Sequence, residues 1–148
     1  MRRAFCVGVV LLLAGLAVPS DARGQQDADP PGIRDSGFRL GQNYPNPFNP
    51  ETRIPFELGE SMFEDGRTVK VTLRIYNVLQ QLVAVPTALN HPQGNGVPVQ
   101  NLEYDSPGPK EAFWDGRDTT GRQVASGIYY MQLIVDGQSV VRRMIVAK

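Results

Sequence analysis

The chain has 148 residues, with 15 basic and 15 acidic side chains, a formal net charge of +0, one cysteine and one histidine. A chain this neutral, without a basic stripe, argues against nucleic acid or an anionic lipid surface as the main partner. Its length permits one modest domain around one hydrophobic core.

Residues 1–24 have the order of features of a secretory signal peptide. An arginine pair precedes an apolar run from Val7 to Val18, and small residues ending at Gly24 offer a cleavage site. The apolar run is shorter than the roughly 20 residues that cross a bilayer. Cleavage would remove Cys6, the only cysteine, so we expect an exported, soluble mature chain without disulfide or thiol chemistry.

Residues 25–37 contain Gln, Asp, Pro and Gly but few apolar side chains, which predicts a flexible leader. We expect the ordered domain to span residues 38–148. Its first feature is Tyr44-Pro45-Asn46-Pro47-Phe48-Asn49-Pro50, whose three prolines exclude a helix or the middle of a sheet. This segment is either a plain surface turn or a recognition feature.

Short strands follow the proline turn. Residues 52–58 alternate in hydrophobicity, and Pro55 places that strand at a sheet edge. Residues 69–76 give the clearest amphipathic strand, with Leu73 and Ile75 among its core-facing residues. A hairpin-like partner follows at 82–85. The stretch from Pro86 to Pro109 interrupts the order, although residues 97–104 could add a strand.

The last third of the chain predicts a hairpin. Extended structure resumes at 111–114 and is followed by a polar turn at 115–121. Strands at 128–135 and 139–146 flank Asp136-Gly137, a strong signal for a type I′ turn. About seven short strands predict an all-β antiparallel sandwich of the immunoglobulin-like kind. Its predicted core residues are Trp114, Leu73, Ile75, Leu133, Ile145 and Tyr129.

Five motifs in this order resemble a known family. They are Leu40 to Pro50 with Thr52, Ile54 and Phe56; Ile75 to Leu79; Trp114 to Asp118 with Gly121; Ala125 to Tyr129; and Arg142 to Met144. Together they resemble the C-terminal sorting domain (type A) of type IX secretion cargo, and they are similar to the immunoglobulin-like domain of the flagellar hook-capping protein.

The resemblance implies an export address rather than a catalyst. It implies two partners: an outer-membrane translocon that recognises the domain, and a sortase-like peptidase that removes it. The protein would cross the inner membrane, pass through the periplasm and reach the cell surface or the medium. The family's motifs fall on Pro45, Asn46 and Pro47, on Gly127 and Tyr129, and on Arg142 and Arg143.

Each sorting motif also has a structural interpretation. Gly127 would serve a strand start that a Cβ would obstruct. Strand alternation turns Arg142 and Arg143 to opposite faces, so at most one is a freely exposed charge. Two features depart from the family pattern. Gln80 stands where glycine is usual, so its turn needs another conformation or a costly positive φ. A sorting domain also normally follows a long passenger, so the chain is either a remnant of a larger gene or itself the delivered domain.

The residues argue against an enzyme. His91 is the only histidine, and it lies in a loop rich in Gly and Pro. There is no second histidine around which a catalytic triad or a metal-binding histidine cluster could be assembled. No nucleophile elbow, phosphate loop or dinucleotide fingerprint is present. Asp115 and Asp118 suggest a calcium loop, but Arg117 lies between them and the alternating acidic ligands are missing. We therefore expect no cofactor and no metal. The alternative function is a structural scaffold or adhesion subunit of a surface assembly, held together by edge-strand contacts.

Overall fold

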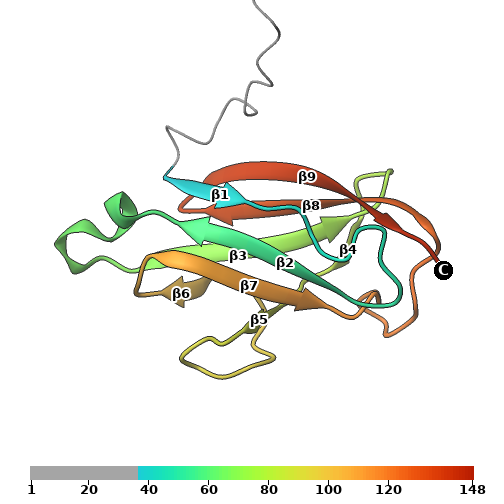
Figure 1. Ribbon diagram of the computed structural model, residues 1–148, viewed down its shortest axis with the longest axis horizontal. Helices are drawn as coiled ribbons and strands as arrows, with labels where there is room; N and C mark the ends of the chain where they lie inside the picture. The colour runs from blue at the N-terminus through green and yellow to red at the C-terminus, as the bar shows by residue number, and fades with distance from the viewer. Residues whose placement is uncertain (1–36) are drawn as a thin grey trace, which may run out of the picture.

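The computed structural model describes residues 37–148, which form two antiparallel sheets packed against each other (Figure 1). The predicted signal peptide (1–24) and the predicted leader (25–37), apart from Gly37, lie outside the described residues. The predicted all-β antiparallel sandwich is confirmed. The described chain divides into nine strands, more than the seven or so expected, because several strands are only three residues long.

One sheet has the strand order β1-β2-β7-β5, with β1 at Phe38–Leu40, β2 at Thr52–Leu58, β7 at Gly108–Trp114 and β5 at Thr87–Leu89. The other has the order β4-β3-β8-β9, with β4 at Leu82–Ala84, β3 at Val69–Tyr76, β8 at Gly127–Val135 and β9 at Gln138–Val146. β6, at Leu102–Tyr104, also pairs with β3. A short 3-10 segment, η1 at Glu60–Gly66, connects β2 to β3.

The core lies between the sheets and contains most of the predicted residues. Leu73, Ile75 and Leu133 are completely buried, and Trp114 is nearly so. Ile145 was predicted as a core residue, and this is wrong: its side chain is 36% exposed. Alternation along β9 turns its neighbours Met144 and Val146 inward and therefore places Ile145 on the outer face.

β2 is not the edge strand that Pro55 suggested, because β1 pairs with one of its sides and β7 with the other. The proline is tolerated because of where β1 ends. The carbonyl of Pro55 accepts a hydrogen bond from Gly41 N at 2.8 Å, so the backbone of Pro55 faces the β1 side. β1 ends at Leu40, so the missing N–H falls just beyond that strand and is not required for pairing with β7.

Two turns have positive φ, one that the sequence predicted and one for which it left the conformation open. Asp136 (φ 47°) and Gly137 (φ 84°) join β8 to β9 in a two-residue turn with the positive φ pair of type I′. Gln80 adopts a φ of 61°, in place of the usual glycine. Asn77 holds that turn, because its Oδ1 accepts hydrogen bonds from the N–H groups of Leu79 and Gln81, each at 3.0 Å.

The Gly- and Pro-rich stretch from Pro86 to Pro109 is more ordered than predicted. It contributes β5 and β6, of which β6 covers only the end of the possible strand at 97–104. Val99 is completely buried there, and its carbonyl accepts a hydrogen bond from Leu73 N at 2.8 Å. Three-residue strands are too short to show a period of two, so no pattern in the sequence predicts them.

His91 and Tyr104 pack edge to face in this stretch, with ring centroids 4.8 Å apart. His91 Nδ1 accepts a hydrogen bond from Gln93 N, so Nε2 carries the proton and donates to the carbonyl of Glu103 at 2.8 Å. The Tyr104 hydroxyl is buried and finds no hydrogen-bond partner among the described residues. Burial raises the pKa of Tyr104 from 10.0 to about 12.

Tyr104 should therefore make the fold sensitive to alkali. The unfolded chain releases the phenolic proton near pH 10 and the folded chain only near pH 12. Stability from this group is present below pH 10 and is lost as the pH rises towards 12. Between pH 9 and pH 11 the free energy of unfolding of wild type should fall by about 1.3 kcal/mol more than that of Tyr104→Phe. Urea titrations at both pH values measure the difference, and parallel losses in the two proteins would contradict it.

Within residues 37–148, no helical segment has the length and apolar character required to span a bilayer.

Candidate recognition surface at the terminal hairpin

The proline turn, Tyr44 to Pro50, lies between β1 and β2 of one sheet and is hydrogen-bonded to β9 of the other sheet, at one end of the sandwich. At its start, Tyr44 exchanges two backbone hydrogen bonds with Arg53 of β2, each at 2.9 Å. Further along, Phe48 N donates to the carbonyl of Ile145 in β9, and Ala147 N donates to the carbonyl of Phe48, each at 3.1 Å. The turn therefore lies along the outer edge of β9 and covers the end of that strand.

Asn46 is the motif residue that makes the most direct contact with β9. Its Oδ1 accepts a hydrogen bond from Ile145 N at 3.0 Å. Pro45 and Pro47 flank it and are exposed. All three X-Pro peptide bonds of the turn, those preceding Pro45, Pro47 and Pro50, are cis. The predicted proline motif thus presents two exposed rings on either side of an asparagine that binds the terminal strand.

A buried polar network beneath the turn was missed by sequence reasoning. Asn43 and Thr52 are 2% and 1% exposed. Asn43 Nδ2 donates to Thr52 Oγ1 at 3.1 Å and to the carbonyl of Pro45 at 3.2 Å, and Thr52 Oγ1 donates to the same carbonyl at 3.1 Å. Because buried polar groups are costly to leave unpaired, this network fixes the path of the turn. A buried Asn is unusual, and no pattern in the sequence distinguishes it from an exposed turn residue.

An aromatic cluster anchors the same turn in the core. Phe48 is 1% exposed and packs edge to face on Trp114 with centroids 5.3 Å apart, and Trp114 contacts Tyr129 at 6.0 Å. The hydroxyl of Tyr129 donates to the carbonyl of Ala125 at 2.8 Å, and burial raises the pKa of Tyr129. The structure therefore places Tyr129 in the core, where it supports the proline turn from below.

Gly127 begins β8, as predicted, but the reason predicted for it is wrong. A Cβ at this position would meet no atom within 4 Å, so nothing obstructs it. Gly127 instead has a φ of 151°, a conformation that side-chain-bearing residues rarely adopt. It pairs with Val146 at the end of β9, close to the residues that the proline turn covers.

Arg142 and Arg143 point to opposite faces, as alternation predicted. Arg142 is half-buried, and its Nε donates to the carbonyl of Leu40 at 2.7 Å. Arg143 is exposed, and its backbone carbonyl accepts a hydrogen bond from Gln42 Nε2 at 3.1 Å. Arg142 therefore ties β9 to the end of β1, and Arg143 offers its charge to solvent.

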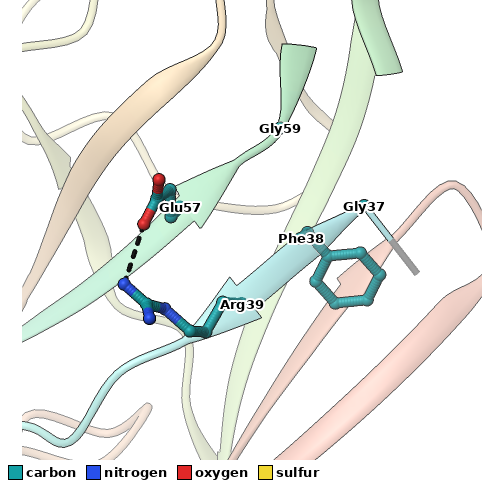
Figure 2. A pocket seen from close by; sticks show the side chains of 5 residues that line it. All are labelled: Gly37, Phe38, Arg39, Glu57 and Gly59. Carbon is teal, nitrogen blue, oxygen red and sulfur yellow. Dashed lines mark hydrogen bonds and ion pairs between the residues drawn. The ribbon is translucent and has the colours of Figure 1, made fainter. Parts of the chain in front are cut away.

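A groove of about 770 Å³ runs beside these contacts and has Gln42, Tyr44 and Arg142 in its wall. A smaller hollow of about 300 Å³ lies at the start of β1 (Figure 2). There Arg39 Nη2 and Glu57 Oε2 lie 2.9 Å apart across neighbouring strands, both about half exposed. An ion pair this exposed is screened by water and is worth little, so the smaller hollow lacks the features of a ligand site.

The aspartates considered for calcium instead organise their own loop. Asp118 Oδ1 accepts hydrogen bonds from Thr120 Oγ1 at 2.7 Å and from Arg122 N at 3.0 Å, and these bonds lower the pKa of Asp118. Asp115 Oδ1 accepts one from Arg117 N at 3.0 Å. Among residues 37–148, no group of three His, Cys, Asp or Glu residues could hold a metal ion.

Asn46→Ala should show how firmly the turn holds the terminal strand. Loss of the bond to Ile145 N should lower the free energy of unfolding by about 1 kcal/mol. It should also speed hydrogen exchange at the Ile145 amide. Asn49→Ala is the matched control, because Asn49 is exposed, precedes a proline in the same turn and makes no side-chain hydrogen bond within the described chain. Equal effects of the two changes would show that Asn46 does not hold β9.

Comparison with known proteins shows the fold. No protein-family model and no curated protein match the chain. A solved structure of dimeric latent PorU from Porphyromonas gingivalis is 19% identical with a TM-score of 0.50, and covers 74% of this chain. One of PorZ, described as an essential bacterial surface component of the type IX secretion system of the same organism, is 18% identical, covers 74% and has a TM-score of 0.43. This chain spans 9% of the PorU chain and 11% of the PorZ chain.

Proposed function

We propose that this chain is a non-catalytic export-address and surface-anchoring module, recognised by the outer-membrane machinery of type IX secretion. One observation carries the proposal. The motif residues Asn46 and Arg143, 97 positions apart in the sequence, belong to one continuous surface formed by the proline turn and β9. A recognition address needs its parts on one rigid surface, and the buried network and aromatic cluster beneath the turn supply that rigidity. The fold shared with part of PorU is one that such a module requires.

The use of the polar side chains supports a module without catalysis. Both ring nitrogens of His91 form hydrogen bonds that stabilise a loop, and the carboxylate of Asp118 accepts hydrogen bonds within its own turn. Arg142 is bound to a backbone carbonyl. These groups stabilise the sandwich, whereas catalytic groups converge on a concave site.

An export assay tests the proposal. Residues 38–148 are fused behind a signal peptide and a fluorescent reporter in a host with type IX secretion. We expect the reporter at the cell surface or in the medium, and peptidase removal of the module should shorten the product. Arg143→Glu should reduce export, whereas Arg67→Glu, the same charge change at another exposed arginine, should leave it unchanged. A reporter that stays in the periplasm would count heavily against the proposal.

A scaffold subunit is the second candidate, favoured by the incompletely covered edge of β9. Edge strands pair readily with other chains. Light scattering at micromolar concentration should then detect self-association, and a strict monomer would disfavour the scaffold.

A further inference from the structure

β9 is the outer strand of its sheet, and β1 of the other sheet lies near it without forming a ladder of hydrogen bonds with it (Figure 1). On this side only the half of β9 that ends at Val146 is hydrogen-bonded, to the segment around the proline turn. In an antiparallel strand, successive residues direct their backbone groups alternately to the two sides. Ile145 faces the free edge, since it bonds to Asn46 and Phe48. Arg143 and Val141, two and four positions earlier, therefore face that edge as well.

The hydrogen bonds from the segment around the proline turn to the free edge of β9 end at Arg143. The carbonyl of Arg143 accepts its bond from Gln42, but its N–H, and both backbone groups of Val141, have no partner among the described residues. Proteins usually protect such an edge with proline, a bulge or a covering loop. Here the side chain of Val141 is 53% exposed, and the open half of the strand has no proline, no bulge and no hydrogen-bonded covering loop. Its one protective feature is Arg142, a charged side chain turned inward and bonded to the carbonyl of Leu40.

The outer face beside this edge is apolar and cationic. Register places Tyr130 beside Tyr76 and Val141 beside Gln132. These four residues, together with Asn77, Val78 and Gln80 of the turn after β3, line a groove. Ile128 and Ile145 extend the apolar area, each more than a third exposed.

Two arginines stand in the same cross-strand rows. Arg143 lies opposite Tyr130 and Arg74 lies opposite Gln132, and neither forms an ion pair within residues 37–148. These rows hold no acidic side chain: they consist of Leu82, Tyr76, Tyr130 and Arg143 in one and Arg74, Gln132 and Val141 in the next. The face therefore complements a partner that brings carboxylates together with apolar side chains.

We propose that the open half of β9 binds an extended peptide segment, with alternating acidic and apolar side chains, as an added strand. Backbone bonds to Val141 and Arg143 would hold the segment. Alternation would place its carboxylates on the outer face beside Arg143 and turn its apolar side chains towards the other face of the sheet. The inference goes beyond the proposed function, because it specifies the chemistry of a partner and applies equally to a scaffold.

Binding of synthetic peptides to the full chain tests it without any export host. A fluorescently labelled nine-residue peptide of alternating valine and glutamate should bind by anisotropy at least ten times more tightly than a matched peptide of valine and lysine. Equal binding of the two peptides, or no binding of the acidic one at millimolar protein, would overturn the proposal.

Two variants locate the site. Val141→Pro removes an N–H that faces away from β8, and it should abolish binding. Arg143→Glu alters only an exposed side chain and should reverse the preference between the two peptides. Arg67→Glu is the control for charge and should bind as wild type does. If instead the chain dimerises in sedimentation and Val141→Pro abolishes the dimer, the edge belongs to a second copy and the peptide proposal is wrong.

Discussion

Replacing Phe48 with alanine should lower the free energy of unfolding by about 3–5 kcal/mol, the cost of deleting a large buried aromatic side chain. Phe48 is 1% exposed and packs against the ring of Trp114. The substitution removes that contact and leaves a cavity at the point where the proline turn enters the core. Denaturant titration measures the loss.

Tyr44→Ala is the matched control for Phe48→Ala. Both residues are aromatic and belong to the proline turn, but Tyr44 is 46% exposed and lies in the wall of the groove beside Arg142. We expect it to cost less than about 1 kcal/mol. Similar losses for the two variants would contradict the view that Phe48 anchors the turn. If Tyr44→Ala impairs export at unchanged stability, the exposed ring belongs to the recognised surface.

Local patterns in the sequence predicted the sandwich because its longer strands obey them. Alternation placed Leu73 and Leu133 in the core, and Asp136-Gly137 fixed the terminal hairpin. The same rule, applied with attention to register, would have placed Ile145 outside. That residue is apolar and faces outward, and apolar character alone was the wrong guide to its burial.

The candidate surface depended on contacts between distant residues, which no local pattern reveals. The sequence predicted Asn46 and Arg143 separately, but the hydrogen bonds that join Asn46 and Gln42 to β9 link residues 99 and 101 positions apart. The buried pair Asn43 and Thr52 was missed for the same reason, since their side chains are satisfied by each other, by the carbonyl of Pro45 and, for Asn43, by the side chain of Gln42. The sequence identified Gly127 as a required glycine, but the requirement comes from its backbone conformation and not from a lack of space for a Cβ.

Gly116→Ala should be the most damaging substitution of a single methyl group. Gly116 has a φ of 74°, and a Cβ there would run into the backbone carbonyl oxygen of Pro50. The positive φ costs about 1–2 kcal/mol for an L-residue, and displacement of the neighbouring backbone adds about 1–3 kcal/mol. The expected loss of about 2–5 kcal/mol exceeds that for any glycine whose surroundings are open.

Gly121→Ala separates these two causes. Gly121 lies in the same loop with a φ of 85°, but a Cβ there would meet nothing within 4 Å. It should therefore cost only the conformational part, about 1–2 kcal/mol. Gly116→Ala should also speed hydrogen exchange at the Phe48 amide, because it displaces Pro50, whereas Gly121→Ala should not. Equal stability losses with unchanged exchange would mean that the Trp114-Asp115-Gly116 turn does not position the proline turn against β9.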